Sequence, residues 1–497
     1  MAHLLISAAH KSSGKTIVTA GLCAALRARG LAVQPFKKGP DYIDPMWLSL
    51  AAGRACRNLD FNTQSQAELL ADFARHAAAA DIALIEGNKG LFDGVDLEGS
   101  DSNAALAVLL GAPVVLVVDV RGMTRGVAPL LRGYMDFQPG PRIVGVILNK
   151  VGGARHEEKL RAVIERFTAL PVLGAIHRHT ELEIPEHHLG LVPSVEYNNA
   201  GERIAAFAEL VARWVDLDRL LELAGAASPP SMALRRQPAP VTLKRQPAPV
   251  TLKRPPARAA MDAARTLRLG IARDAAFCFY YANDLEALEA AGAELVPVDM
   301  LNDARLPDID GLFIGGGFPE SHMGALEANA ALRAETRHAI EAGLPVYAEC
   351  GGLMYLARSL TWRGETRAMA GVIPADAVMQ ERPVGRGYVR LRETDAFPWP
   401  DVGRSRGGHE TAAHEFHYSS LRNLPEGMTF AYEVLRGHGL DGRHDGIVYK
   451  NLLASYVHLR DTEQGAWAKR FVAFVRQCGW RRDASIRAAK PPRMVQG

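Results

Sequence analysis

The chain has 497 residues, of which 48% are hydrophobic and 23% are charged. This composition excludes a disordered chain, and the length predicts two or three domains with a sizeable core. The formal net charge is only +3, from 58 basic and 55 acidic side chains. The charge balance therefore gives no indication of a protein that binds nucleic acid or a membrane surface.

The five cysteines are widely separated, with no CxxC pair among them. An odd number at such spacing argues against a disulfide framework and favours a reducing compartment. The apolar run at the N-terminus is too short for a signal peptide, and the longest apolar stretch, 104–118, is interrupted by Gly111 and Pro113. We therefore expect a cytoplasmic protein without a membrane span.

The first part of the chain alternates short β-branched runs with alanine- and leucine-rich segments of helical spacing. The strand candidates are 3–8, 31–37, 80–87, 113–119 and 142–150, and the first helix candidate is 16–30. The last part repeats the pattern, with strand candidates 268–274, 293–299, 311–317 and 345–350 and helix candidates 283–292 and 331–343. This alternation predicts two α/β domains, each built on parallel strands with helices on both faces.

A proline-rich segment separates the two domains. The nonapeptide RQPAPVTLK at 236–244 is repeated letter for letter at 245–253. Proline fixes φ and removes a backbone donor, so we expect an extended linker at 228–264, and we favour a spacer over a docking peptide. The predicted organisation is a first domain at 1–227, this linker, a second domain at 265–478 and a basic tail at 479–497.

A phosphate-binding loop follows the first strand candidate. The sequence SAAHKSSGKT at 7–16 joins that strand to a helix, although it has Ala9 where the strict P-loop pattern has glycine. Backbone N–H groups and the helix N-terminus would hold ATP phosphates there. We expect this of Ser13, Gly14, Lys15 and Thr16, with Lys15 at the β and γ phosphates and the Thr16 hydroxyl on Mg²⁺.

Acidic residues follow the next strand candidates. Asp41 and Asp44 come after the second strand, Glu86 ends the third, and Asp93 follows shortly afterwards. Open parallel sheets bind ligands at the carboxyl ends of their strands, so these acids should lie near the phosphates and suit Mg²⁺. Asn149 also ends a strand, where its amide could read a purine edge, although a turn or cap role is at least as plausible.

The second domain contains a nucleophile motif. Cys350 lies between a strand and a helix in PVYAECGGLMYL (345–356), where a tight turn would lift the sulfur towards a helix N-terminus. Backbone N–H groups of Gly316, Gly317 and Gly351 could form an oxyanion hole. A base is required, and His458 in SYVHLR is the best candidate, with His414 and His417 in HEFHYS as alternatives.

With these motifs in place, the chain resembles the cobyrinic acid a,c-diamide synthases, which are two-domain amidotransferases of corrinoid and related tetrapyrrole biosynthesis. The resemblance covers the whole chain except the linker and the tail. The matching segments are SSGKT, FKKGPDYIDP, IEGNKGLFDG, IPEHHLGLVP, GGGFPE, AECGGLMYL and HEFHYS. It implies a dethiobiotin-synthetase-like P-loop domain followed by a class I glutamine amidotransferase-like domain.

The resemblance also implies an activity and a set of roles. Cys350 and His458 would release ammonia from glutamine, and ATP would activate the a and c carboxylates of a tetrapyrrole as acyl phosphates. Thr16, Asp41 and Glu86 would hold Mg²⁺, Asp44 and Asp93 would lie at the reacting carboxylate, and Asn149 would contact adenine. The partners expected are small molecules, neither nucleic acid nor membrane, and a homodimer is left open.

Two departures from the family pattern keep alternatives open. Class I glutaminases usually carry a glutamate two residues after the histidine, where this chain has Arg460, so Cys350 and His458 could act as a dyad. Lys38, Trp47 and Lys89 also differ from the pattern and could suit sirohaem or nickel-sirohydrochlorin. Further alternatives are a cobyric acid synthase and a ParA-like nucleotide switch with an inactive glutaminase-like domain.

Overall fold

A computed structural model describes residues 1–179, 184–187, 190–227, 266–401 and 408–479. The first domain contains β1 (Ala2–Ala8), α1 (Lys15–Ala28), β2 (Val33–Lys38), α2 (Ile43–Ala52), β3 (Arg57–Leu59), α3 (Gln66–Ala77), β4 (Ile82–Glu86), α4 (Asn103–Leu110), β5 (Val114–Asp119), α5 (Val127–Asp136), β6 (Ile143–Val151), α6 (Ala154–Phe167), β7 (Val172–His177), β8 (Glu186–His187), β9 (Gly190–Leu191), the 3-10 helix η2 (Ser194–Glu196), α7 (Ala200–Trp214) and α8 (Leu217–Gly225).

The main sheet of this domain is parallel and has seven strands in the order β3-β2-β4-β1-β5-β6-β7. Successive side chains of a strand point to opposite faces, and β1 shows the result. Leu4 and Ile6 pack into one core with α1, α2, α7 and α8, whereas Leu5 packs into the other with α3, α4, α5 and α6. The loops at the carboxyl ends of the strands remain free to form a site.

The second domain contains β10 (Leu267–Ala272), β11 (Phe277–Phe279), α10 (Ala282–Ala290), β12 (Ala293–Val298), β13 (Gly311–Ile314), β14 (Gly316–Gly317), the 3-10 helix η3 (Pro319–His322), α11 (Met323–Ala328), α12 (Ala330–Glu341), β15 (Val346–Glu349), α13 (Gly351–Leu356), β16 (Ser359–Trp362), β17 (Glu365–Ala368), β18 (Asp376–Met379), β19 (Gly385–Glu393), β20 (Glu410–His417), β21 (Ser419–Arg422), β22 (Phe430–Arg436), β23 (His444–Tyr449), β24 (Leu452–Ser455) and α14 (Trp467–Cys478).

The large sheet of this domain has the order β12-β10-β13-β15-β24-β23-β22-β19-β20. Strands β12 to β24 in this order pair in parallel, and the strands from β23 to β20 continue the sheet antiparallel. One core lies under α11, α12 and α13, and the other lies under α10 and α14. The predicted α/β class and the two-domain organisation are confirmed, whereas the antiparallel half of this sheet was not predicted.

The predicted strands and helices of both domains are present with ends shifted by a few residues. Strands β3 and β7 were missed, because β3 is only three residues long and β7 lacks a strong β-branched run. The predicted linker at 228–264 and the tail beyond Gly479 lie outside the described residues. Within the described part of the chain, every helix is too short or too polar to cross a bilayer.

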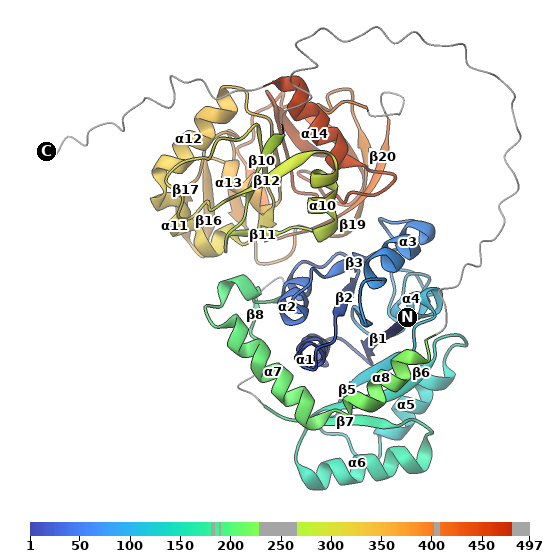
Figure 1. Cartoon of the computed structure of the whole chain (residues 1–497). Helices are drawn as coiled ribbons and strands as arrows, with labels where there is room; N and C mark the ends of the chain where they lie inside the picture. The colour runs from blue at the N-terminus through green and yellow to red at the C-terminus, as the bar shows by residue number, and fades with distance from the viewer. Residues whose placement is uncertain (180–183, 188–189, 228–265, 402–407, 480–497) are drawn as a thin grey trace, which may run out of the picture.

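The two domains contact each other through the β3–α3 region of the first and α10 and β19 of the second (Figure 1). Arg57 forms an ion pair with Glu286, and the amide of Asn283 donates to Asp72. The Tyr388 hydroxyl donates to Asp60 at 3.0 Å. These contacts come from elements that flank both predicted sites, and they hold the carboxyl ends of the two sheets towards each other.

Candidate active site

The nucleophile position lies in a strained turn between β15 and α13. Cys350 adopts φ 46° and ψ −97°, a left-handed region that a residue with a side chain rarely occupies. Its backbone N–H donates to the carbonyl oxygen of Ser455 on the neighbouring strand end, which fixes the turn. The thiol therefore sits at the N-terminus of a helix and on the carboxyl edge of the sheet, as predicted for a nucleophile elbow.

His458 lies next to this cysteine in a buried pocket. Burial alone would lower the pKa of His458, but the neighbouring Cys350 sulfur and Glu349 carboxylate outweigh it and raise the pKa to about 10. An imidazole held between a sulfur and a carboxylate is the arrangement in which a histidine can exchange protons with a cysteine nucleophile. Of the three histidines that the sequence indicated, His458 is therefore the one that lies against the Cys350 sulfur.

The two alternative histidines occupy supporting positions. His414 stacks on His458 with ring centroids 5.0 Å apart, and its pKa is lowered well below the usual range by burial and by the charge of His458. His414 therefore stays neutral beside the imidazolium. His417 stacks on Tyr456 at 4.1 Å, and its Nδ1 contacts the Ser419 carbonyl oxygen at 2.9 Å. His417 thus packs beneath the site rather than against the nucleophile.

The glycines predicted for the oxyanion hole come together around the nucleophile. A Cβ added to Gly351 would stand 3.1 Å from the backbone nitrogen of Gly317, so the backbones at these two positions approach closely. A Cβ at Gly316 would stand 2.6 Å from Cε1 of His458. Glycine is required at position 316 because a side chain there would occupy the space next to the His458 imidazole.

The phosphate loop has the geometry that its sequence predicts. Gly14 caps α1 at φ 86°, and a Cβ there would collide with the Asn149 amide. The Ser13 hydroxyl donates to the carbonyl oxygen of His10 at 2.8 Å and holds the turn closed. The Lys15 ammonium donates to the Lys89 carbonyl oxygen, in the segment after β4, at 2.6 Å.

A charged cluster lies beside this loop, at the ends of β2 and β4. Lys37 is fully buried, and its Nζ lies 2.5 Å from Asp44 Oδ2, 2.7 Å from Glu86 Oε1 and 4.0 Å from Asp41 Oδ2. Burial would lower the pKa of Lys37, but the carboxylates of Asp44 and Glu86 raise it well above its usual range. Sequence analysis predicted the acids but gave no role to Lys37.

The two aspartates of this cluster differ in the direction in which their pKa is shifted. Burial and the negative charge of Asp44 raise the pKa of Asp41 to about 7. Burial would raise the pKa of Asp44 as well, but the ammonium of Lys37 reverses the effect and lowers it. Asp93, the last predicted acid, is exposed and accepts a hydrogen bond from Gly90 N at 2.8 Å. Its carboxylate lies close enough to the Lys15 ammonium to favour the charged form of that lysine.

The oxygen atoms at the edge of the cluster fit a magnesium ion. The Thr16 hydroxyl donates to Glu86 Oε1 at 3.0 Å, and Glu86 Oε2 is buried without a hydrogen-bond partner. Mg²⁺ usually takes one or two protein oxygens and completes its shell with water and phosphate. Within the described residues, no group of three or more His, Cys, Asp or Glu side chains forms a site of its own. The chemistry of the donors thus fits an ion that arrives with nucleotide phosphates.

Asn149 lies beneath the phosphate loop rather than in open space. Its Nδ2 donates to the Ser13 carbonyl oxygen at 2.9 Å, and its Oδ1 accepts from Lys150 N at 2.9 Å. Both ends of the amide are therefore engaged in bracing the loop. Contact with adenine would require Asn149 to give up the bond to Ser13.

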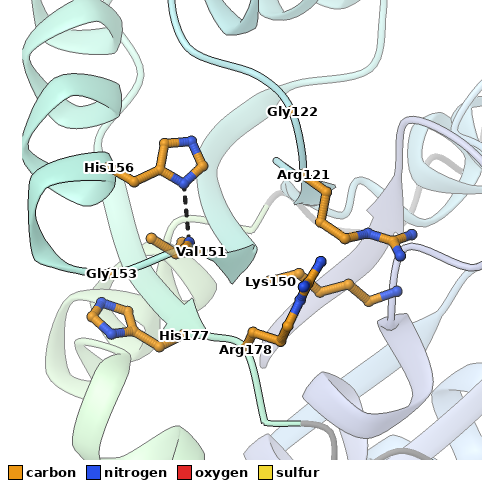
Figure 2. A pocket seen from close by; sticks show the side chains of 9 residues that line it. Arg121, Gly122, Lys150, Val151, Gly153, His156, His177 and Arg178 are labelled. Carbon is orange, nitrogen blue, oxygen red and sulfur yellow. Dashed lines mark hydrogen bonds between the residues drawn. The ribbon is translucent and has the colours of Figure 1, made fainter.

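An open pocket of about 400 Å³ adjoins the loop at the ends of β5, β6 and β7. Figure 2 shows the side chains of Arg121, Lys150 and Arg178 gathered on one side and the rings of His156 and His177 on the other. Lys150 also donates to the carbonyl oxygen of Ser12 in the phosphate loop, at 3.3 Å. One lining residue, Lys150, thus also contacts the phosphate loop, and three of the nine lining residues are Arg or Lys.

Tyr42 lies between the charged cluster of the first domain and the cysteine site of the second. It lies between Asp41 and Asp44 in the motif KKGPDYIDP, and its ring stacks on Phe279 of the second domain with centroids 5.1 Å apart and planes 3° apart. The same ring lies 5.3 Å from the His458 ring. One short segment of the first domain therefore supplies both the acids of the charged cluster and a wall of the cysteine site.

Arg460, the departure from the class I pattern, forms part of the domain interface. It is 2% exposed, and its guanidinium donates to the Asn58 carbonyl oxygen and, at 3.5 Å, to the Thr63 hydroxyl of the first domain. It also lies over the Tyr281 ring at 5.2 Å. In turn, the Asn58 amide holds the carbonyl oxygens of Gly39 and Asp41. Arg460 therefore ties the histidine segment to the acidic motif of the first domain.

Replacing Arg460 by methionine is expected to destabilise the protein by about 2–4 kcal/mol, because buried polar partners lose their charged donor. For a domain of this size the thermal unfolding midpoint should fall by roughly 5–10 °C, measured by calorimetry. Arg443→Met, at an exposed arginine of the same domain, is the matched control and should change the midpoint little. A midpoint equal to that of the unmodified protein would contradict the interface contact.

Three residues of the site were missed by sequence reasoning, namely Lys37, Tyr42 and Glu349. Each lies inside a motif already recognised, where Tyr42 stands between Asp41 and Asp44 and Glu349 directly precedes Cys350. The suggestion that Trp47 faces the substrate is wrong. Trp47 is fully buried against Tyr197 and Phe207 and donates to the Val192 carbonyl oxygen at 3.0 Å, so it belongs to the core.

Comparison with known proteins agrees with this division of the site. Residues 5–192 match the CobQ/CobB/MinD/ParA nucleotide binding domain, and residues 268–464 match the CobB/CobQ-like glutamine amidotransferase domain. The chain is thus a nucleotide-binding, glutamine-hydrolysing amidotransferase with one domain for each task. A nucleotide switch with an inactive second domain is thereby set aside.

Curated relatives narrow the class. The cobyrinate a,c-diamide synthase of Magnetococcus marinus is 50% identical over 476 residues, which cover 96% of this chain and 97% of the relative. Those of Methanosarcina acetivorans and Archaeoglobus fulgidus are each 39% identical, over 92% and 94% of this chain and 92% and 96% of their own. The chain belongs to the family of cobyrinate a,c-diamide synthases.

Proposed function

We propose that this enzyme converts the a and c carboxylates of cobyrinic acid, or of its cobalt-free counterpart hydrogenobyrinic acid, into primary amides. ATP supplies the driving force, and glutamine supplies the nitrogen. The observation that carries the proposal is the segment 41–44, which contributes Asp41 and Asp44 to the charged cluster and Tyr42 to the cysteine site. Activation of an acid and release of ammonia are thereby brought side by side.

The first domain would activate the carboxylate. A carboxylate is a poor electrophile, because its charge repels nucleophiles and oxide is a poor leaving group. A carboxylate oxygen attacks the γ-phosphorus, the bond to the ADP oxygen breaks, and an acyl phosphate results. Lys15 and Lys37 stabilise the negative charge that spreads over the transferring phosphoryl group. The base and ribose occupy the pocket beside Lys150, while the Ser13–Thr16 backbone cradles the phosphates.

Thr16, Glu86 and the nearby Asp41 would hold Mg²⁺. When bound, this ion neutralises charge on the phosphate oxygens and orients them for transfer. Asp44, at the start of α2, and Asp93, in the segment after β4, would face the carboxyl groups of the substrate and the incoming ammonia.

The second domain would release ammonia. The Cys350 thiolate attacks the side-chain amide carbon of glutamine, and the backbone N–H groups of Gly317 and Gly351 stabilise the oxyanion. His458 donates its proton to the leaving nitrogen, so that ammonia departs and a thioester remains. His458 then accepts a proton from water, which attacks the thioester to give glutamate. The unprotonated ammonia attacks the acyl carbon, and phosphate leaves.

The test is product analysis with a panel of substrates. Purified enzyme with ATP, Mg²⁺ and ¹⁵N-amide glutamine should incorporate two labelled nitrogens into cobyrinic or hydrogenobyrinic acid, as measured by mass spectrometry. Sirohaem and nickel-sirohydrochlorin are the alternative acids and should remain unlabelled. Carboxylate oxygen labelled with ¹⁸O should appear in inorganic phosphate if the acyl phosphate forms. Labelling of sirohaem alone would overturn the substrate assignment but not the chemistry.

A further inference from the structure

A buried carboxylate contacts the histidine of the cysteine site from an unexpected position. Glu349 is the residue immediately before Cys350 and is 2% exposed. Its Oε2 lies 3.2 Å from His458 Nδ1. Its Oε1 accepts hydrogen bonds from the Leu459 backbone N–H at 2.9 Å and from the Tyr347 hydroxyl at 2.5 Å. Both carboxylate oxygens are therefore held in place.

This arrangement determines which nitrogen of the imidazole faces the nucleophile. A carboxylate already satisfied by N–H and O–H donors only accepts, so Nδ1 of His458 carries a proton towards Glu349. Nε2 is then left for the Cys350 sulfur. The contact with Leu459 N also anchors the backbone directly after His458, so Glu349 controls both the orientation of the ring and its tautomer.

The remaining groups around His458 do not supply this function. His414 stacks on the ring from β20 and is neutral, and Tyr42 approaches it from the first domain. Arg460, two residues further on, turns its guanidinium to Asn58 of the other domain. Glu349 is thus the carboxylate that the structure places on Nδ1.

We propose that Glu349 is the positioning residue of the glutaminase, and that it takes the role usually filled by a glutamate two residues after the histidine. With Glu349 in this role, the chain can have arginine at position 460 and still form a catalytic triad of Cys350, His458 and a carboxylate. The proposal rests on the roles of Cys350 and His458 in the proposed function. It replaces the expectation of a dyad.

Glu349→Gln keeps the shape of the side chain but turns at least one N–H towards the donors that now point at it. We expect kcat for glutamine hydrolysis to fall about 10- to 100-fold, with little change in KM for glutamine. The basic limb of the kcat–pH profile should move to lower pH, because the imidazolium loses a negative partner and its pKa falls. Amidation with ammonium salt should continue, because the first domain is unaffected.

Two further variants make the outcome decisive. Glu349→Asp keeps the charge but withdraws it from Nδ1, so kcat should be intermediate and the basic limb should stay near that of the unmodified enzyme. Asp445→Asn is the matched control, since Asp445 is a fully buried carboxylate that binds Ser455, Tyr456 and Val457 without touching His458. That variant should lose thermal stability and leave the basic limb in place.

The possible failures are distinguishable. Unchanged kcat and pH profile in Glu349→Gln, with Cys350→Ala inactive towards glutamine, would overturn the positioning role and leave the proposed function standing. Equal loss of glutamine- and ammonia-dependent activity without a shift of the limb would also overturn it, because the residue would then be only structural. If Glu349→Gln does not fold, a kcat of Glu349→Asp equal to that of the unmodified enzyme would likewise overturn the positioning role. Glutamine hydrolysis by Cys350→Ala would overturn both proposals.

Discussion

Replacing Cys350 by alanine is expected to reduce glutamine-dependent amidation by more than about a thousandfold while amidation with a high concentration of ammonium salt continues. In the proposed mechanism the Cys350 sulfur forms the bond with glutamine, whereas the carboxylate is activated in the other domain. Alanine removes one atom from a turn that already holds Cys350 at φ 46°, so the backbone need not change. The measurement is a paired assay of amide product with each nitrogen source.

A matched control comes from Cys56, a fully buried cysteine of the first domain whose thiol pKa burial raises well above the usual range. Cys56→Ala should leave both nitrogen sources usable. Loss of both activities in folded Cys350→Ala protein would contradict the division of labour between the domains. Retention of the glutamine-dependent rate would remove Cys350 from the mechanism.

Replacing Lys15 by alanine should abolish activity with both glutamine and ammonium salt, by at least about a hundredfold. The Lys15 ammonium follows the phosphate loop and lies 2.6 Å from the Lys89 carbonyl oxygen, and an incoming γ-phosphate would accept hydrogen bonds from it. Without that cation, charge on the transferring phosphoryl group is not stabilised and the acid is not activated. Glutamine hydrolysis measured by itself should survive, because Cys350 and His458 lie in the other domain.

Lys159→Ala is the control for this experiment, because Lys159 is an exposed lysine on α6 of the same domain. Its amidation rate should equal that of the unmodified enzyme. An unaltered rate in Lys15→Ala would remove the phosphate-loop assignment. Restoration of activity by Lys15→Arg would show that positive charge alone suffices at this position.

Much of the site could be predicted because its chemistry is local in sequence. The phosphate loop is a contiguous strand–turn–helix segment, and Gly14 at φ 86° shows why glycine is required there. The turn at Cys350 is equally local, with glycines after the nucleophile. The acids Asp41, Asp44 and Glu86 could be grouped because parallel strands end at the same edge of a sheet.

What could not be predicted depends on contacts between distant residues. Lys37 is an unremarkable lysine in the sequence, and only the pairing of β2 with β4 places its ammonium between Asp44 and Glu86. The sequence left the Asn149 amide available to contact a base, but in the fold β6 places it where it donates to the Ser13 carbonyl oxygen. Trp47 was suggested as a substrate contact from the sequence, whereas the structure packs it from α2 against Phe207 of α7.

The two chemistries, with a candidate nucleophile and a phosphate loop, could be predicted from the sequence, because each is carried by a short segment whose backbone conformation its own residues dictate. Three other features follow from tertiary packing alone, namely which carboxylate contacts His458, what Arg460 binds, and how Tyr42 lies between the two sites. Those contacts join residues more than a hundred positions apart. They arise from the packing of one domain against another and of one strand beside the next, and no local pattern encodes such packing.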